Sequence, residues 1–203
     1  MKVLEKLGFM EEINQKIDSL KVVDFKREVE VSGKFIELFK GEYLLNNNEW
    51  IMRETVAKKV GSGNAVAIFA VTCDKKILLV IQPRVSLDTD TKINIELPAG
   101  YIEYGEEDVL AGMRELGEET GYFSKSVKKV DEYYPSLGAS GEKITLLLAL
   151  DCEKVKKLAL DSDEYLDCVS VSLEEFKYLM DNGYIKDVNA RIGYYKYLEY
   201  LRK

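Results

Sequence analysis

The sequence predicts an α+β fold, in which a mixed sheet lies between helices and a small antiparallel β-meander precedes it. In the first third of the chain, alternating apolar residues are broken by turn residues, a pattern typical of a meander. Beyond residue 64, strand-like and helix-like segments follow in the order strands, helix, strands, helix. We therefore expect two domains, at residues 1–60 and 61–203, with a hinge-like Gly-Ser-Gly-Asn sequence at their junction.

The first domain divides into one helix-like segment and three strand-like segments. Residues 3–20 carry apolar residues at loosely helical spacing, although Gly8 interrupts the pattern. The three strand-like segments lie at residues 22–31, 34–45 and 49–60. A meander of about 40 residues is too small to be stable by itself. It must therefore lie against its own core domain or against a second chain.

The second domain begins with strands. The apolar run at residues 65–71 suits a buried strand. Charged residues at 74–76 then provide a turn before the apolar residues 77–85. Three later strands are expected at residues 127–134, 143–151 and 169–172.

Two helices are expected at the C-terminal end. Ser172 and Glu175 have the spacing of a capping box, which marks the start of a helix. Asn182 and Gly183 end that helix, because both residues favour turns and glycine favours the position after a helix. A final helix is expected at about residues 187–202.

The bulk composition is that of an ordinary soluble globular protein, with 46% hydrophobic and 32% charged residues. The net charge of −7 argues against a nucleic-acid groove. There is no apolar run near the roughly 18 residues that a membrane span needs. The N-terminus also lacks a basic region followed by an apolar stretch, so no secretory signal is expected.

Histidine is absent from the sequence, which excludes His-based triads and His metal sites. Any general base must be a carboxylate, a lysine, a tyrosine or a metal-bound hydroxide. Cys73, Cys152 and Cys168 are odd in number and far apart, without a C-x-x-C pair for zinc. We interpret them as small buried apolar residues of a cytoplasmic protein.

The most informative segment is residues 100–122, which read GYIEYGEEDVLAGMRELGEETGY. Glu115, Glu118 and Glu119 are three and four residues apart, so a helix would place them on one face. Crowded carboxylates repel one another unless a cation lies among them. Hard divalent ions such as Mg²⁺ or Mn²⁺ take oxygen ligands of this kind. The alternative is an acidic helix face that is merely solvated.

The segment resembles the Nudix box, the signature of hydrolases that cleave a nucleoside diphosphate linked to another group. Its spacing is G-x5-E-x7-R-E-L-x-E-E-x-G, and the final position holds Tyr122 where an aliphatic residue is usual. The matching positions are Gly100, Glu106, Arg114, Glu115, Glu118, Glu119 and Gly121. The resemblance implies an α/β/α sandwich with a mixed sheet and a Mg²⁺-dependent enzyme that uses two or three ions.

The resemblance also implies roles for individual residues. The implied metal ligands are the side chains of Glu115, Glu118 and Glu119 and the backbone carbonyl of Ala99. In the catalytic group, Glu118 contributes directly or through water, and Arg114 orients the glutamates. Three positions are implied to be structural: Glu106 braces the loop, while Gly100 and Gly121 serve a turn and a helix end.

Residues outside the box resemble those of ADP-ribose pyrophosphatases. Residues 133–142 read YYPSLGASGE, similar to the substrate loop of those enzymes, although Leu137 replaces a proline. Glu142 in this loop is the implied general base, and Gly138 is implied to lie near the substrate. The alternative is that Pro135 and Gly138 simply make a turn.

Further matches lie upstream of the box. Arg53 and Glu54 stand where these enzymes carry an Arg-Glu pair, and Arg84 stands where they carry an arginine that can grip a diphosphate bidentately. Both arginines could instead form surface salt bridges. The candidates for stacking on adenine are Tyr43, which we favour, and Phe39 and Trp50, although each could be a core residue. The resemblance also implies a homodimer, in which the first domain serves dimerisation and substrate binding.

The expected function is Mg²⁺-dependent hydrolysis of ADP-ribose or a related ADP-sugar to AMP and a sugar phosphate. One alternative is a Nudix hydrolase of another compound, such as a nucleoside triphosphate or flavin adenine dinucleotide. NADH hydrolysis is less expected, because that branch commonly carries a four-cysteine zinc module. Another alternative is a non-catalytic Nudix fold that senses a nucleotide. Neither nucleic acid nor membrane is expected as a partner.

Overall fold

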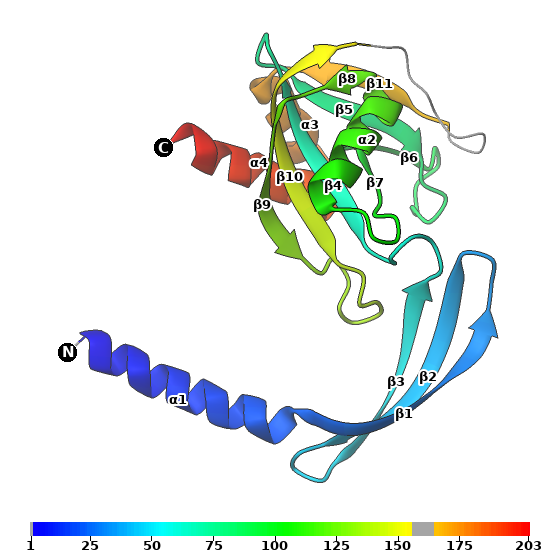
Figure 1. Ribbon diagram of the computed structural model, residues 1–203, viewed down its shortest axis with the longest axis vertical. Helices are drawn as coiled ribbons and strands as arrows, with labels where there is room; N and C mark the ends of the chain where they lie inside the picture. The colour runs from blue at the N-terminus through cyan, green and yellow to red at the C-terminus, as the bar shows by residue number, and fades with distance from the viewer. Residues whose placement is uncertain (1, 156–164) are drawn as a thin grey trace. The chain divides into compact units, whose positions relative to one another are not determined.

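A computed structural model describes residues 2–155 and 165–203 of the chain. The described residues pack into two compact units (Figure 1). The first unit comprises residues 1–59 together with Ser136–Gly141, and the second comprises Val60–Pro135 and Glu142–Lys203. Within the described residues, no helix is both long enough and apolar enough to cross a membrane.

The first unit contains a helix and an antiparallel meander. Its elements are α1 (Lys2–Leu20), β1 (Val22–Ser32), β2 (Ile36–Leu45) and β3 (Trp50–Lys58). The strands pair in the order β1-β2-β3, as expected from the alternating sequence. Gly8 lies inside α1 and does not end it. Asn48 takes a left-handed φ of 68° in the turn between β2 and β3, which asparagine tolerates better than most residues.

A segment from the second half of the chain completes this unit. The backbone N–H of Val56 on β3 donates to the carbonyl of Ala139 at 2.7 Å. Val56 also forms a parallel bridge with Ser140. The outer edge of β3 is therefore partly covered by residues 136–141, whereas β1 forms the other edge of the sheet.

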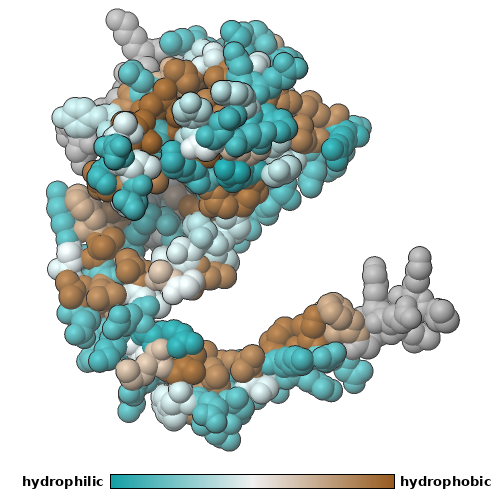
Figure 2. Space-filling view, turned by 180° about the vertical axis from the view of Figure 1, so that it is seen from behind, coloured by the Kyte–Doolittle hydropathy of each residue, from teal (hydrophilic) through white to brown (hydrophobic). Residues whose placement is uncertain are grey.

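The first unit exposes an unusual amount of apolar surface (Figure 2). Every residue of β1 is exposed. Among the described residues, Leu45 is the one buried hydrophobic side chain of this unit. Its large exposed side chains include Phe9, Ile17, Leu20, Val23, Phe25, Val29, Val31, Trp50 and Met52. An exposed apolar area of this kind marks an interaction surface more often than a solvated one.

The second unit is built on a mixed sheet of eight strands. These are β4 (Ala65–Thr72), β5 (Ile77–Pro83), β6 (Ile93–Glu96), β7 (Ala99–Tyr101), β8 (Tyr122–Phe123), β9 (Ser126–Tyr133), β10 (Ile144–Lys154) and β11 (Asp167–Val171). The central path is β11-β5-β4-β10-β8. Strands β4 and β10 run parallel, while the other pairings are antiparallel.

Helices cover both faces of this sheet (Figure 1). They are α2 (Asp108–Thr120), α3 (Leu173–Asp181) and α4 (Val188–Leu201). Successive residues of a strand point to opposite faces, and β4 is buried along its whole length. Its Val66 and Ile68 pack on the side of Leu116 of α2. The α/β/α layering and the mixed sheet that the sequence predicted are therefore confirmed.

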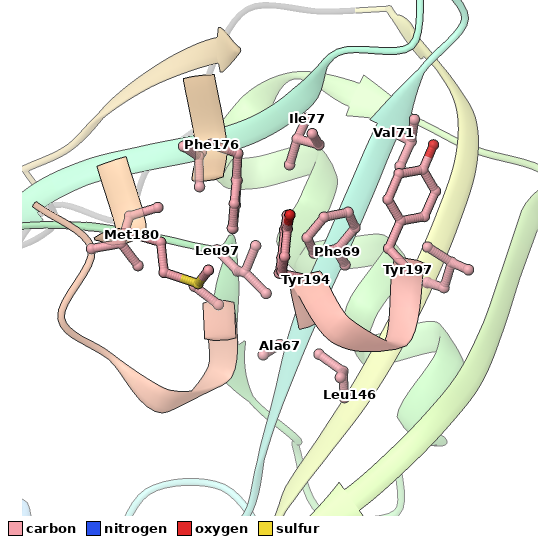
Figure 3. Packing of buried hydrophobic residues seen from close by; sticks show 14 of the residues in the cluster. Ala67, Phe69, Val71, Ile77, Leu97, Leu146, Phe176, Met180, Tyr194 and Tyr197 are labelled. Carbon is pink, nitrogen blue, oxygen red and sulfur yellow. The ribbon is translucent and has the colours of Figure 1, made fainter. Parts of the chain in front are cut away.

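The face covered by α3 and α4 holds a cluster of aromatic side chains (Figure 3). Phe69 of β4 lies 5.5 Å from the ring of Phe176 and 5.1 Å from that of Tyr197. Phe176 stacks on Tyr194 with the ring planes 4° apart. Burying side chains of this size contributes roughly 1.5–3 kcal/mol each, so this cluster fixes the two C-terminal helices on the sheet.

Local signals in the sequence placed the helix ends correctly. Ser172 accepts a hydrogen bond from the Glu175 backbone, and the Glu175 side chain accepts one from the Ser172 backbone, which completes the expected capping box. Gly121 ends α2 with a left-handed φ of 74°, and its N–H donates to the carbonyl of Gly117. The short strands β6, β7 and β8 were not expected.

Candidate active site

Helix α2 presents the three glutamates that the sequence singled out. Glu115 and Glu119 are buried, with 8% and 2% of their surface exposed, and Glu118 is half-buried. Leu116 and Ala111 on the adjoining face of the helix pack into the core. This packing turns the acidic stripe toward the short strand β7. Buried carboxylates need compensating partners.

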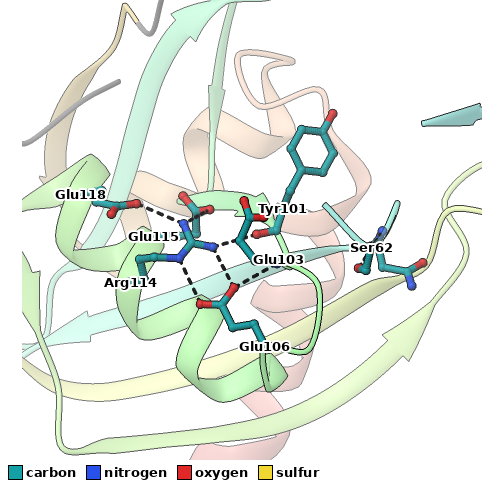
Figure 4. Close-up of polar contacts among 8 residues, drawn as sticks. Ser62, Tyr101, Glu103, Glu106, Arg114, Glu115 and Glu118 are labelled. Carbon is teal, nitrogen blue, oxygen red and sulfur yellow. Dashed lines mark hydrogen bonds and ion pairs between the residues drawn. The ribbon is translucent and has the colours of Figure 1, made fainter. Parts of the chain in front are cut away.

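Arg114 pairs with two of these acids, Glu115 and Glu118 (Figure 4). Its Nη1 atom lies 2.7 Å from Glu115 Oε1 and 3.2 Å from Glu118 Oε2. On its other side, Nε lies 3.0 Å from Glu106 Oε1 and Nη2 lies 3.0 Å from Glu106 Oε2, which makes a bidentate pair. Nη2 also donates to the backbone carbonyl of Tyr101 at 2.9 Å. The hydrogen bond to Glu106 is the largest contribution that raises the pKa of Arg114.

Glu106 ties this arginine to the loop before α2. Its Oε2 accepts the backbone N–H of Glu103 at 3.0 Å while also receiving Arg114 (Figure 4). The hydrogen bond from Arg114 holds the pKa of Glu106 below its usual value. Glu106 therefore stays ionised at neutral pH, and its contacts are those of a residue that braces the loop.

The backbone of β7 lies against two of the acids. An ideal Cβ on Gly100 would lie 2.1 Å from the carboxylate of Glu115, so glycine is the residue that leaves room for that side chain. The backbone N–H of Ala99 donates to Glu119 Oε2 at 2.8 Å. Ala99, Gly100 and the two glutamates thus form one contiguous group.

This group has the donor chemistry of a site for a hard divalent cation. All of its side-chain donors are carboxylate oxygens, which Mg²⁺ and Mn²⁺ prefer. The space beside Gly100 is occupied by the carboxylate of Glu115, so this acid lies directly against the backbone of β7. In the arrangement described, Arg114 contacts both Glu115 and Glu118. Among the described residues, no three His, Cys, Asp or Glu side chains stand close enough together to hold a metal ion as they are.

Arg84 follows strand β5 directly and lies in the same unit as the glutamates. Its guanidinium pairs with Glu96 of β6, with Nη2 at 2.5 Å and Nε at 2.9 Å from Oε1. Burial acts to lower the pKa of Arg84, but the hydrogen bonds to Glu96 and the charges of Glu96 and its neighbours together outweigh it, so the pKa is raised. The charge of Glu119 acts in the same direction, which places Arg84 within electrostatic reach of the acidic group.

The remaining predicted residues fall in two places. Glu142 is half-buried and lies in the second unit, two residues before β10 begins at Ile144. Arg53 and Glu54 are exposed on β3 of the first unit, where Arg53 Nη1 donates to the Met52 carbonyl at 2.7 Å. Gly138 belongs to the first unit through residues 136–141.

The three aromatic candidates all lie on the meander. Tyr43 of β2 stacks on Phe25, with ring centroids 5.9 Å apart and planes 18° apart. Phe39 lies under the guanidinium of Arg27 at 4.0 Å, and Trp50 is 52% exposed. None of the three is a fully buried core residue.

Sequence reasoning missed two polar contributors to this region. Glu96 and Asn94 are buried and hydrogen-bonded to each other, yet a carboxylate and an amide in a short strand read as surface residues. The carbonyl of Tyr101 also binds Arg114, and a backbone contact leaves no side-chain signal at all. The available hint for Glu96 was its place in the Glu-Leu-Pro-Ala-Gly sequence that precedes the box.

Comparison with known proteins identifies a family and two relatives. Residues 61–191 match the NUDIX domain family. The chain is 36% identical to an ADP-ribose pyrophosphatase of Bacillus subtilis (strain 168), covering 85% of this chain and 90% of the relative. It is 34% identical to a methanol dehydrogenase activator of Bacillus methanolicus, covering 74% and 78% of the two chains.

Among solved structures, the fold matches that of an ADP compounds hydrolase with a TM-score of 0.74. The match covers 91% of this chain and 95% of the other, at 17% sequence identity. At that identity the likeness concerns the fold alone.

Proposed function

The chain belongs to the NUDIX domain family, and we propose that it hydrolyses the pyrophosphate bond of ADP-ribose or a related ADP-sugar, yielding AMP and a sugar phosphate. The observation that carries this proposal is the buried pair Glu115 and Glu119 beside β7: Arg114 pairs with Glu115 and Glu118, and the backbone N–H of Ala99 donates to Glu119. The choice of substrate is supported by the Bacillus subtilis relative, which is named an ADP-ribose pyrophosphatase.

A pyrophosphate bond resists hydrolysis because its negative charges repel a nucleophile. Nudix hydrolases generally use divalent metals, typically Mg²⁺. Bound by Glu115, Glu118, Glu119 and the carbonyl of Ala99, such ions would neutralise phosphate charge and lower the pKa of a coordinated water. We propose two or three ions, with Mn²⁺ as an alternative to Mg²⁺. The protein's part is to keep the ligands ionised and in place.

Three further side chains have proposed roles in the reaction. Arg114 orients the glutamates, since its contacts are to Glu115, Glu118 and Glu106. Glu142 accepts the proton of the attacking water as general base. Arg84 grips the diphosphate, because a guanidinium presents paired N–H donors that match phosphate oxygens.

The first unit supplies the proposed recognition of the rest of the substrate. Arg53 and Glu54 on β3 bind polar groups, Tyr43 stacks on the adenine, and Gly138 lets the backbone of residues 136–141 approach the substrate. The domain division at residue 60 is proposed as a functional one: the first part serves recognition and dimerisation, and the second carries the chemistry.

We also propose that the protein is a homodimer in the cytoplasm. The support for a dimer is the exposed apolar surface of β1 and the near absence of buried side chains in the first unit, as far as the structure describes it. The support for a cytoplasmic location is that Cys73, Cys152 and Cys168 are all free thiols, although only Cys152 is buried as expected and Cys73 is exposed.

Two other functions compete with this proposal. One is hydrolysis of a nucleoside triphosphate or of flavin adenine dinucleotide by the same site. The other is nucleotide sensing without catalysis. The Bacillus methanolicus relative is named as an activator of another enzyme, so relatives of this similarity differ in the role they are assigned. The intact set of acids favours catalysis.

A substrate panel with Mg²⁺ tests the proposal. ADP-ribose should be turned over fastest, and Glu119→Gln and Glu142→Gln should each lower kcat by about a hundredfold or more, the usual size of general-base effects. Glu107→Gln is the matched control, because Glu107 is exposed and makes no capping hydrogen bond at the start of α2. The proposed function would be contradicted by full activity in both Glu119→Gln and Glu142→Gln, or by a clear preference for a compound other than ADP-ribose.

A further inference from the structure

Strands β5 and β6 place Asn94 and Glu96 on one face of the sheet, together with the residues of β5 that pair with them. Their antiparallel register pairs Val80 with Glu96 and Gln82 with Asn94. Residues two apart in a strand point to the same side, so Asn94 and Glu96 share a face. Arg84 continues this ladder beyond β5, since its backbone N–H donates to the carbonyl of Lys92 at 2.6 Å. Its side chain can therefore reach back to Glu96.

The contacts form a relay that ends at the guanidinium of Arg84. Glu96 Oε1 receives Nε and Nη2 of Arg84, and Glu96 Oε2 receives the Asn94 amide at 2.9 Å. The carbonyl oxygen of the Asn94 side chain then accepts the backbone N–H of Lys186 at 3.3 Å. Both oxygens of Glu96 and both ends of the Asn94 amide are thus engaged.

Burial is unequal along this relay. The side chain of Glu96 is 9% exposed, whereas that of Arg84 is 46% exposed. A buried carboxylate fixed by two partners is a rigid anchor, and the arginine that it holds keeps nearly half of its side chain exposed. A buried ion pair is weak support for stability, because desolvation offsets much of its attraction. Orientation of the guanidinium is the benefit that this arrangement provides.

We propose that Glu96, braced by Asn94, is a positioning residue that holds Arg84 in the orientation in which it grips the substrate diphosphate. This inference rests on the proposed function for the identity of the substrate. A guanidinium fixed before binding loses less side-chain freedom when the diphosphate arrives. The relay therefore acts on substrate binding and leaves the chemical step largely unchanged.

The first test separates KM from kcat. Glu96→Gln keeps the shape and one oxygen acceptor but removes the charge. We expect it to raise KM for ADP-ribose about tenfold, the size expected for a charged hydrogen bond, while kcat changes little. Asn94→Ala should act in the same direction with a smaller effect. Asp151→Asn removes an exposed ion pair with Lys75 and should leave both constants unchanged.

A double-mutant cycle decides whether Glu96 acts through Arg84. In an Arg84→Ala background, Glu96→Gln should raise KM no further. Additive effects, or an equal fall in kcat with KM unchanged, would show that Glu96 acts independently of Arg84. Thermal unfolding of every variant checks that it is folded.

A binding measurement keeps this inference separate from the proposed function. Titration calorimetry of ADP into the metal-free protein reports the diphosphate grip without turnover. Weaker ADP binding in both Arg84→Ala and Glu96→Gln supports the relay even where ADP-ribose is not hydrolysed. Hydrolysis of ADP-ribose together with unchanged ADP binding in Glu96→Gln overturns the relay alone, and a wild type that neither binds ADP nor cleaves ADP-ribose overturns both.

Discussion

Arg114 organises the acidic face of α2 through a single side chain. It contacts three carboxylates and one backbone carbonyl, and these contacts come from the loop, from β7 and from its own helix. Lysine has one ammonium group in place of this planar fork and could not serve all four partners at once. The arginine of the box is therefore explained by geometry and not by charge alone.

Gly100 gives the sharpest prediction at the scale of one residue. In Gly100→Ala the new Cβ would overlap the Glu115 carboxylate, which lies 2.1 Å from the ideal Cβ position. We expect Glu115 to be displaced and kcat to fall about a hundredfold, as misplacement of a catalytic group by about 1 Å does. Steady-state kinetics with Mg²⁺ measures this, and Mg²⁺ titration of the variant should show weaker binding. Wild-type kinetics in this variant would mean that Glu115 has no role at its observed position.

The sequence predicted the position of Gly100 but not the reason for it. The box pattern alone assigned it to a turn, whereas the structure shows that its missing side chain makes room for Glu115. The same limit applies to Glu96. Its residue type is visible in the sequence, while its burial and its pairing with Arg84 depend on the register of two strands.

Elements with local signals were predicted best. The capping box of α3 and the glycine at the end of α2 are decided within a few residues, and both are present. Strands β6, β7 and β8 span only four, three and two residues. Such short strands form because a neighbouring strand offers hydrogen bonds. They are too short to show a periodic pattern of apolar residues in the sequence.

Helix α4 carries a titratable cap that should make stability depend on pH. Asp187 Oδ2 accepts the Ala190 N–H at 2.9 Å, but its buried Oδ1 has no hydrogen-bond partner among the described residues. Burial, together with the charge of Glu96, raises the pKa of Asp187 from 3.8 to about 6. Between these two values the folded protein holds a proton that the unfolded chain has lost. The free energy of unfolding therefore falls as pH rises through this window.

Asp187→Asn should remove this dependence, because asparagine caps a helix equally well without ionising. At pH 7 we expect the variant to be more stable by on the order of 1–3 kcal/mol. Urea unfolding at pH 4, 5, 6 and 7 checks the difference from wild type. Asp181→Asn, an exposed carboxylate on α3, is the control. If the free energies of unfolding of Asp187→Asn and wild type differ by the same amount at all four pH values, Asp187 has the same pKa in the folded and unfolded states.

On the scale of the whole molecule, the two units differ in how they are stabilised. The second unit has a continuous core on both faces of its sheet, whereas the first contributes Leu45 to the buried hydrophobic residues described. The sequence predicted that a small meander could not stand alone. It could not predict which surface is left open, because that depends on side-chain packing around all three strands.

The proposed dimer should depend on the exposed face of β1. Val23 and Val31 are 51% and 58% exposed, and replacing both with glutamate introduces charges that an apolar interface excludes. We expect the wild type to sediment as a dimer at micromolar concentration and Val23→Glu/Val31→Glu as a monomer. Val155→Glu, at an exposed valine of the second unit, is the control. A wild type that sediments as a monomer would contradict the dimer.

Residues 136–141 belong to the first unit although the chain on either side of them belongs to the second. The chain therefore passes between the units three times. A deletion that removed the first 59 residues would also take away the Val56 N–H that the Ala139 carbonyl accepts. The N-terminal part is thus not a self-contained unit. A chimaera that exchanges it between homologues would also have to exchange residues 136–141.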